Sequence, residues 1–529
     1  MGPTHLDVLV VGAGLSGVGM AARLSTLCPD HTYAVLEARA VSGGTWDLFR
    51  YPGVRSDSDM YTLSYPFQPW TDPKSLADGP AILRYIRETS TEYGVEDHVR
   101  YRHRVTRAAW ASETSTWTVT AQTPDGEATF TAGFLYLAVG YYDYDRGHEI
   151  DLPGREDFAG AVVHPQHWPE DLDVTGRRVV VVGSGATAVT LVPALAERGA
   201  ASVTMLQRSP TYLAVLPRED RVGALVHRLL PDRPAHRVMR VKHLAYSLTT
   251  YAMARRLPGV SRRAMARGLR EHLPEGYDVA THLTPAYDPW DQRVCVVPDA
   301  DLLREISRGR VEIVTDHLER LTATGMRLRS GRELPADVVV TATGLRLLVG
   351  GGATVEVDGE VVDPHERHVY KGALLEGVPN LALCMGYTNN SWTLRADLTA
   401  TYVCRLLRHL RDRGWASATP RFDEPPGPPG PPEPILNLTS GYIRRGIAAL
   451  PVQGRGQPWR VRQNYLLDWL AIRTAPIEDG RLELAPRRAA AATAAATAAT
   501  ATAGVATETA ATAAAAHVEP GVGAGVPGP

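Results

Sequence analysis

Two stretches of the chain share one pattern of apolar and polar positions. Residues 7–36 form a continuous apolar run, a glycine-rich turn, an amphipathic helix and a second apolar run, and residues 178–206 repeat this order. Each unit is followed by a further apolar run that closes on a glycine, at Gly140 and at Gly344. The pattern predicts an α/β fold with two Rossmann-like dinucleotide-binding domains in tandem.

The rest of the chain is expected to complete these two domains. Residues 224–288 are arginine-rich and mostly helical in pattern, which predicts a helical insertion that covers a cleft. On either side of this insertion, the pattern places the second nucleotide domain at 146–223 and 289–345. The first domain is expected to cover 1–145 and to resume over 346–485.

The C-terminal part contains a predicted helix and two segments of biased composition. The apolar period predicts a helix from Asp397 to Arg413. Proline dominates residues 420–434, which predicts a stiff, extended linker within the returning part of the first domain. Residues 486–529 consist largely of alanine and threonine with no amphipathic period, so we expect a disordered tail.

The charge balance and the cysteines narrow the class of partner. Lys and Arg number 56 against 58 Asp and Glu, a net charge of -2, so the chain as a whole lacks the basic character of a nucleic-acid-binding protein. The four cysteines form no CxxC pair, which argues against a metal site, a disulfide framework and a redox dithiol, and favours a cytoplasmic location. The expected partner is a small molecule, and homo-oligomerisation is left open.

One moderately apolar segment bears on membrane contact. No stretch of the chain is long and apolar enough to span a bilayer. Residues 243–257 (HLAYSLTTYAMARRL) are moderately apolar and end next to arginines. The segment fits two interpretations: a helix that touches a membrane surface, making the protein peripheral, or a helical cap packed on the core.

The first glycine loop indicates a dinucleotide without a 2'-phosphate. Gly12, Gly14 and Gly17 form GxGxxG between a predicted strand and a predicted helix, where the backbone can approach a pyrophosphate at the helix N-terminus. Glu37 ends the next strand, twenty-five positions after Gly12. A carboxylate at this place accepts hydrogen bonds from ribose hydroxyls, so the first dinucleotide is most simply FAD.

The second glycine loop indicates NADPH. Gly183, Gly185 and Ala188 supply its small residues, and Arg208 follows Gly183 by twenty-five positions, with Ser209 after it. The first unit has the carboxylate of Glu37 at this place, whereas the second unit has the guanidinium of Arg208. A positive charge there attracts the negative charge of a 2'-phosphate.

Residues 158–169 (FAGAVVHPQHWP), just before the second loop, match the pattern FxGxxxHxxxW. The run from Gly43 to Asp57 (GGTWDLFRYPGVRSD) and the Ala-Thr-Gly run ending at Gly344 match two further motifs. On these residues the chain resembles the Baeyer-Villiger monooxygenases, which are class B flavoprotein monooxygenases, and among them the ethionamide-activating group. The resemblance covers roughly residues 5–485.

The resemblance implies roles for individual residues. Arg293 would be the catalytic arginine beside the flavin and Asp57 its carboxylate partner, because a fixed guanidinium stabilises a peroxide anion and its adduct with a ketone. Many relatives have a lysine before that arginine, directed at the NADP phosphate, where this chain has Gln292. The implied FAD contacts are Ser16, Glu37, Thr45, Trp46, Asp47, Leu48, Asp57 and, by its backbone, Val105. The implied NADP contacts are Arg55, Ser56, Asp57, Ser184, Gly185, Ala186, Thr187, Ala188, Val189, Thr190, Arg208 and Ser209.

The implied activity is the oxidation of ketones to esters or lactones by O2 and NADPH through a C4a-peroxyflavin, with sulfides and thioamides as further acceptors. Two alternatives share the scaffold: an N-hydroxylating flavin monooxygenase and a non-catalytic, redox-sensing flavoprotein. The polar-aromatic cluster Tyr387, Asn389, Asn390 and Trp392 is expected either near the substrate or in the core.

Overall fold

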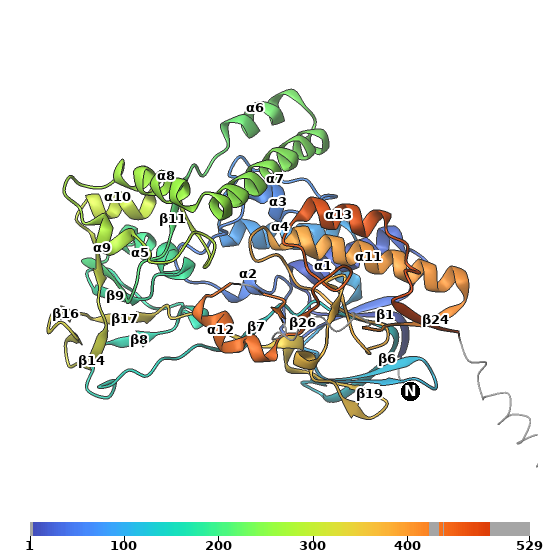
Figure 1. Cartoon of the computed structure of the whole chain (residues 1–529). Helices are drawn as coiled ribbons and strands as arrows, with labels where there is room; N and C mark the ends of the chain where they lie inside the picture. Colours follow the sequence, from blue (N-terminus) through green and yellow to red (C-terminus); the bar gives the residue numbers. More distant parts are fainter. Residues whose placement is uncertain (1–3, 423–432, 437, 487–529) are drawn as a thin grey trace, which may run out of the picture.

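The computed structural model describes residues 4–422, 433–436 and 438–486 (Figure 1). It contains two large sheets with helices packed against them, and a further group of helices at the top of the view. Most of the proline-rich segment and the tail from residue 487 onward lie outside the described residues, so the expectations for both stay predictions.

The first sheet is built on the first predicted unit. β1 (Thr4–Val11) pairs in parallel with β2 (Tyr33–Glu37) and with β6 (Gly126–Leu137), and α1 (Leu15–Leu27) joins β1 to β2. All five residues of β2 are buried, as expected for a strand covered on both faces. In spatial order the sheet consists of β20 (Glu360–Val361), β19 (Thr354–Val357), β4 (Arg104–Ala111), β5 (Thr116–Thr123), β6, β1, β2 and β3 (Val99–Tyr101).

The chain returns to this first sheet after the second. β23 (Leu381–Leu383) pairs in parallel with β6, and α11 (Trp392–Arg413) packs along α1. The predicted start of this helix at Asp397 was wrong, because α11 begins five residues earlier, at Trp392. Leu394 and Ala396 in the added turn are buried. Packing in the first domain therefore stabilises this turn, which the local apolar period did not predict.

The second sheet contains the second predicted unit, and its five strands are parallel. Helix α5 (Ala186–Glu197) follows the second glycine loop, and α10 (Asp301–Ser307) packs against α5. The two parallel β–α–β units confirm the predicted α/β fold class. In spatial order the sheet consists of β13 (Val311–Thr315), β10 (Ser202–Gln207), β9 (Arg178–Val182), β17 (Val338–Thr341) and β8 (Ala161–Val163).

A group of helices joins the two sheets along the upper side of Figure 1. α6 and α7 are connected by two residues and pack on each other, α7 also packs on α3 (Met60–Leu63) of the first domain, and α8 packs on β11 (Leu213–Leu216). The structure has no described helix that is long and apolar enough to cross a membrane. The bounds are α6 (Arg221–Leu229), α7 (Asp232–Arg256), α8 (Pro258–Arg270) and α9 (Val279–Leu283).

Candidate active site

A cavity of about 1090 Å³ lies where residues of both sheets meet, at the carboxyl ends of their parallel strands. Open α/β sheets bind their ligands at this edge. The cavity collects most of the residues that the sequence selected. Those that line it are Gly12, Gly14, Ser16, Glu37, Thr45, Trp46, Leu48, Arg55, Ser56, Asp57, Val105, Gly183, Ser184, Gly185, Ala186, Thr187, Arg208, Ser209 and Arg293.

The first glycine loop has the geometry of a diphosphate cradle. Gly12 has a φ of +101°, and a Cβ there would lie 2.8 Å from the carbonyl oxygen of Ala138. The carboxylate of Glu37 accepts backbone N–H bonds from Ala13 at 2.7 Å and from Arg39 at 2.8 Å. Burial raises the pKa of Glu37, and these two hydrogen bonds oppose the shift. The loop and the carboxylate at its side fit the diphosphate and ribose of FAD.

The second glycine loop repeats this geometry with a cation in place of the carboxylate. Gly183 has a φ of +135°, and a Cβ there would lie 2.3 Å from the carbonyl oxygen of Ala342. The Ser184 hydroxyl donates to the carbonyl oxygen of Ser209 at 3.1 Å, which ties the loop to the end of β10. Arg208 leaves β10 at the same place and lines the cavity. These residues fit the diphosphate and 2'-phosphate of NADPH.

The structure brings Arg293 and Asp57 together from segments far apart in the chain. The Nε of Arg293 lies 4.0 Å from the Oδ2 of Asp57, and the side chain of Asp57 is 10% exposed. Burial raises the pKa of Asp57, while the charges of Arg293 and Arg55 oppose the rise. Asp57 therefore takes up a proton at a higher pH than an exposed aspartate does. Both side chains line the cavity, so Arg293 can present its charge there.

Three tyrosines that the sequence did not single out surround this arginine. Tyr141 and Tyr142 follow β6, their hydroxyls lie 3.1 Å apart, and Tyr442 comes from α12 (Gly441–Gly446). Burial tends to lower the pKa of Arg293, but Asp57 and then these three phenols raise it above its usual value. No local pattern marks a tyrosine as the neighbour of a residue 150 positions away, so only the tertiary fold shows this environment.

One face of α7 contacts three segments that line the cavity. Positions spaced by four residues lie on the same side of a helix. The contacts are His243 with Asp59, Ser247 with Asn390, Tyr251 with Trp290, and Arg255 with Asp291. Asp59 follows the segment of Asp57, Asn390 itself lines the cavity, and Trp290 and Asp291 precede Arg293 in sequence. α7 therefore fixes the separation of the two candidate catalytic residues.

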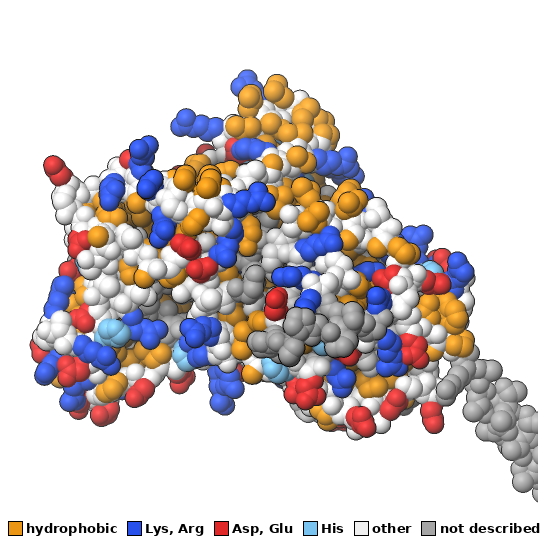
Figure 2. Space-filling model, in the orientation of Figure 1, with side chains coloured by type: hydrophobic (Ala, Val, Ile, Leu, Met, Phe, Trp, Pro, Cys, Tyr) orange, Lys and Arg blue, Asp and Glu red, His pale blue; other side chains and the backbone are white. Residues whose placement is uncertain are grey.

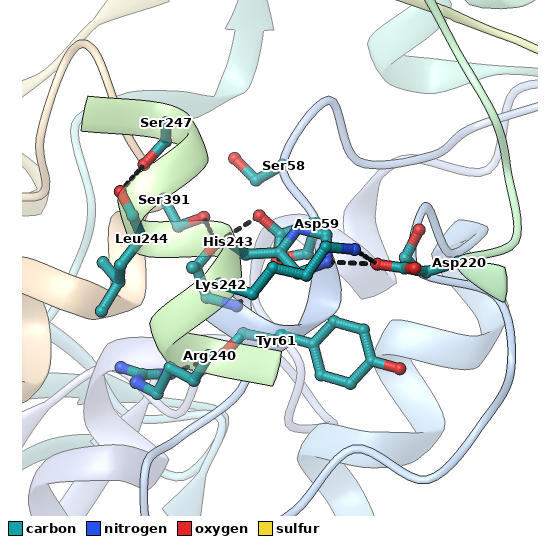
Figure 3. Close-up of polar contacts among 12 residues, drawn as sticks. Ser58, Asp59, Tyr61, Asp220, Arg240, Lys242, His243, Leu244, Ser247 and Ser391 are labelled. Carbon is teal, nitrogen blue, oxygen red and sulfur yellow. Dashed lines mark hydrogen bonds and ion pairs between the residues drawn. The ribbon is translucent and has the colours of Figure 1, made fainter. Parts of the chain in front are cut away.

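Figure 3 shows the charged residues around His243, near the middle of α7. His243 lies between two carboxylates: its Nε2 is 2.8 Å from Asp220, the N-cap of α6, and its Nδ1 is 3.4 Å from Asp59, the N-cap of α3. Lys242 also pairs with Asp220. Burial tends to lower the pKa of His243, but the hydrogen bonds and charges of Asp59 and Asp220 raise it above its ordinary value. The protonated imidazole thus links three helices.

Replacing His243 by Asn is expected to destabilise the protein in a pH-dependent manner. Since the folded-state pKa of His243 is raised, its contribution is fully present below the unfolded pKa of about 6.5 and is lost as the pH rises through the folded value. The expected loss is about 1.5–3 kcal/mol at acid pH. Melting curves at pH 6 and pH 9 measure it. The exposed His5, changed to Asn, is the control, and an equal loss at both pH values would contradict the prediction.

The FxGxxxHxxxW segment does not line the cavity, and its residues Ala161–Val163 form β8 at the edge of the second sheet. A Cβ on Gly160 would lie 2.3 Å from the carbonyl oxygen of Asp337, and one on Gly147 of β7 (Tyr142–Gly147) would lie 2.1 Å from the His164 ring. The partly buried Trp168 packs against the core of the second domain. The segment therefore packs β7, the strand that precedes it in the chain, next to the second sheet.

A few predicted cofactor residues lie outside the cavity lining. Asp47 is buried in ion pairs with Arg39 and Arg87, at 2.6 and 2.9 Å. A Cβ on Gly17 would lie 1.8 Å from the carbonyl oxygen of Gly12, so this glycine lets α1 pack against the loop. Ala188, Val189 and Thr190 are buried in α5 behind the second loop. The implied cofactor contacts of all these residues stay predictions.

The polar-aromatic cluster is divided between the cavity and the interior. Tyr387, Asn390 and Trp392 line the cavity, and the indole N–H of Trp392 donates to Ser16 at 2.7 Å. The phenol of Tyr387 donates to the buried Asp468 at 2.7 Å. Asn389 is buried and donates to the carbonyl oxygen of Gln463. The cluster therefore joins the cavity wall to the C-terminal part of the first domain.

Similarity to known proteins agrees with this site. A family profile described as pyridine nucleotide-disulphide oxidoreductase matches residues 6–232. The chain is 49% identical over 485 residues to the FAD-containing monooxygenase EthA of Mycobacterium tuberculosis, covering 92% of this chain and 99% of that one. The chain belongs to the FAD-containing monooxygenases. Another relative is the probable FAD-binding monooxygenase AlmA of Acinetobacter baylyi, at 42% identity over 90% of this chain and 96% of that one.

Solved structures share the fold of this monooxygenase. Steroid monooxygenase bound to NADP superposes with a TM-score of 0.70 at 21% identity, covering 91% of this chain and all of that one. Polycyclic ketone monooxygenase from Thermothelomyces thermophila gives 0.71 at 18% identity, covering 92% and 91%. OTEMO in complex with FAD and NADP gives 0.66 at 22% identity, covering 79% and 88%.

Two of the four cysteines are neighbours in the fold: the Sγ of Cys28 lies 3.5 Å from the carbonyl oxygen of Cys404. Cys28, Cys295, Cys384 and Cys404 are all buried and free. Among the described residues there is also no cluster of three or more His, Cys, Asp or Glu side chains arranged for a metal ion.

Proposed function

We propose that this FAD-containing monooxygenase is of the Baeyer-Villiger type and uses NADPH and O2 to convert a ketone to an ester or lactone. The observation that carries the proposal is the Arg293–Asp57 pair at a cavity that also contains both glycine loops. One solved structure of the same fold is named a polycyclic ketone monooxygenase, and another is named a steroid monooxygenase bound to NADP.

Each group of residues has a distinct task in this proposal. FAD, when bound, supplies the electron transfer and the activation of O2. Arg293 provides a positive charge that is fixed in advance where negative oxygen develops, and Asp57 pairs with the guanidinium. Glu37 accepts from the FAD ribose, and Arg208 binds the 2'-phosphate of NADPH. The apolar lining excludes water, and α7 holds the walls of the cavity together.

The test is substrate-dependent turnover with product analysis. The purified holoenzyme is given NADPH, 18O2 and a panel of linear and cyclic ketones, and one labelled oxygen atom is expected in the ester or lactone. A parallel panel of sulfides and thioamides measures oxygenation at sulfur. N-hydroxylated amines as the only products would favour the N-hydroxylating alternative. NADPH oxidation that gives only hydrogen peroxide, or none at all, would favour the redox-sensing one.

We also propose that the enzyme works in the cytoplasm on a small-molecule substrate. The absence of any disulfide among its four cysteines is compatible with a reducing compartment. Equal distribution between the cytosolic and periplasmic fractions of an expressing bacterium would contradict this location.

A further inference from the structure

Helix α6 and the first half of α7 expose their large apolar side chains. Val222, Leu225 and Leu229 lie on one face of α6, at spacings of three and four, and are 51%, 56% and 70% exposed. Leu230 in the connection and Val238 and Val241 on α7 are also exposed. We call these six residues the α6–α7 patch. Gly223 is the one buried residue of α6, so the helix directs its apolar face outward rather than into the core.

The surroundings of the patch are strongly basic. Residues 221–270 contain eleven arginines and Lys242 against one acidic residue, Asp232, in a chain whose total net charge is -2. Arg228, Arg233 and Arg237 are exposed, and none of them has an ion-pair partner in the described part of the chain. Figure 2 shows apolar side chains at the top of the molecule with Lys and Arg on their flanks. Exposed apolar residues that are ringed by unpaired cations mark an interaction surface.

We propose that the α6–α7 patch docks the enzyme on the surface of an anionic lipid bilayer. The apolar side chains enter the boundary between headgroups and acyl chains, and the surrounding arginines bind the lipid phosphates. The surface differs from the segment that the sequence pointed to, because His243, Ser247 and Tyr251 of that segment face inward against the cavity walls. The outer side of the same segment exposes Tyr246, Met253 and Leu257, by 50%, 41% and 55%.

The composition of the patch favours lipid over other anionic partners. A nucleic acid is bound through phosphate contacts and stacking aromatic residues, and it makes no use of a row of exposed leucines and valines. A second copy of the same surface would bring at least three unpaired arginines against three others. A bilayer suits both the arginines and the apolar side chains, because it presents phosphates at its surface and hydrocarbon beneath them.

Docking through this patch would place α7, the helix that contacts the cavity walls, at the bilayer surface. Val238 and Val241 belong to the outer face of α7, and the residues that contact the cavity walls belong to another face, namely His243, Ser247, Tyr251 and Arg255. An apolar ketone dissolved in the bilayer would then be close to the helix that covers the cavity. This consequence rests on the proposed function, whereas the docking surface itself does not.

The experiment is sedimentation of the holoenzyme with vesicles of phosphatidylcholine, with and without phosphatidylglycerol. The wild type is expected to bind the mixed vesicles, less strongly as salt increases. Changing Leu225→Glu together with Leu229→Glu is expected to reduce the partition coefficient at least tenfold, because both apolar contact and charge attraction are lost. Arg228→Ala, Arg233→Ala and Arg237→Ala are each expected to reduce it about fivefold.

Val361→Glu is the matched control. Val361 is 67% exposed on β20, outside the insertion, so its change should leave vesicle binding intact. Bound FAD and a melting temperature equal to that of the wild type show that each variant is folded, whatever its substrate. The proposal is overturned if the wild type does not bind the mixed vesicles, or if the leucine variant binds as the wild type does. It is also overturned if duplex DNA binds more tightly than the vesicles and displaces them, or if the patch instead forms a dimer interface that Leu225→Glu with Leu229→Glu dissociates.

Discussion

Arg293→Ala is expected to lower ketone oxygenation by about 100- to 1000-fold while NADPH oxidation continues. The loss of a donor placed in advance at a developing negative charge has effects of this size. Arg293 lines the cavity 4.0 Å from Asp57, and the negative charge of that carboxylate raises the pKa of the guanidinium. Without this arginine, the reduced enzyme should still react with O2, but the electrons of NADPH should be used to form hydrogen peroxide in place of oxygenated product.

The measurement is the ratio of oxygenated product to NADPH consumed, with hydrogen peroxide quantified in parallel. Arg293→Lys keeps a charge but not the planar guanidinium, so it is expected to retain part of the activity. Arg262→Ala is the matched control, because Arg262 is an exposed arginine whose nearest carboxylate, Asp288, lies 3.6 Å away. Unchanged coupling of product to NADPH in Arg293→Ala would remove this residue from the mechanism.

Arg208→Ala is expected to weaken NADP+ binding by about 10- to 100-fold and to leave NAD+ binding unchanged. Hydrogen bonds to a charged group contribute about 1.5–3 kcal/mol each, and only the 2'-phosphate is affected. Arg445 of α12 also lines the cavity, and burial and the charge of Arg208 lower its pKa. Two neighbouring cations at this place suit an anion, although Gln292 supplies no charge.

Calorimetric titration with 2',5'-ADP and with 5'-AMP tests the role of Arg208 in binding the 2'-phosphate, and it does not depend on turnover. Wild type should prefer 2',5'-ADP, Arg208→Ala should lose most of this preference, and Arg445→Ala should lose a smaller part of it. Arg346→Ala is the control, since Arg346 is an exposed arginine that does not line this cavity. An undiminished preference for 2',5'-ADP in Arg208→Ala would assign the phosphate to another cation.

The sequence predicted those parts of the site that local geometry encodes. A strand, a glycine turn and a helix occupy about thirty consecutive residues, and the positive φ of Gly12 and Gly183 leaves few alternatives to glycine. Glu37 and Arg208 follow at the ends of the next strands, so their positions at the cavity also derive from short segments. The start of α11 was predicted wrongly because it depends on packing in the first domain, which the local apolar period does not contain.

The sequence by itself determined two tandem dinucleotide units and the resemblance to flavin monooxygenases, because these features are encoded over short distances; the two kinds of nucleotide contact that it indicates stay predictions. Only the tertiary structure decided which distant residues meet. Asp57 and Arg293 are brought together from separate segments, and α7 contacts both regions through side chains spaced four apart. The sequence already marked residues 224–288 as arginine-rich, but only the tertiary structure shows that Arg228, Arg233 and Arg237 are exposed near exposed apolar side chains, because burial depends on contacts between distant segments.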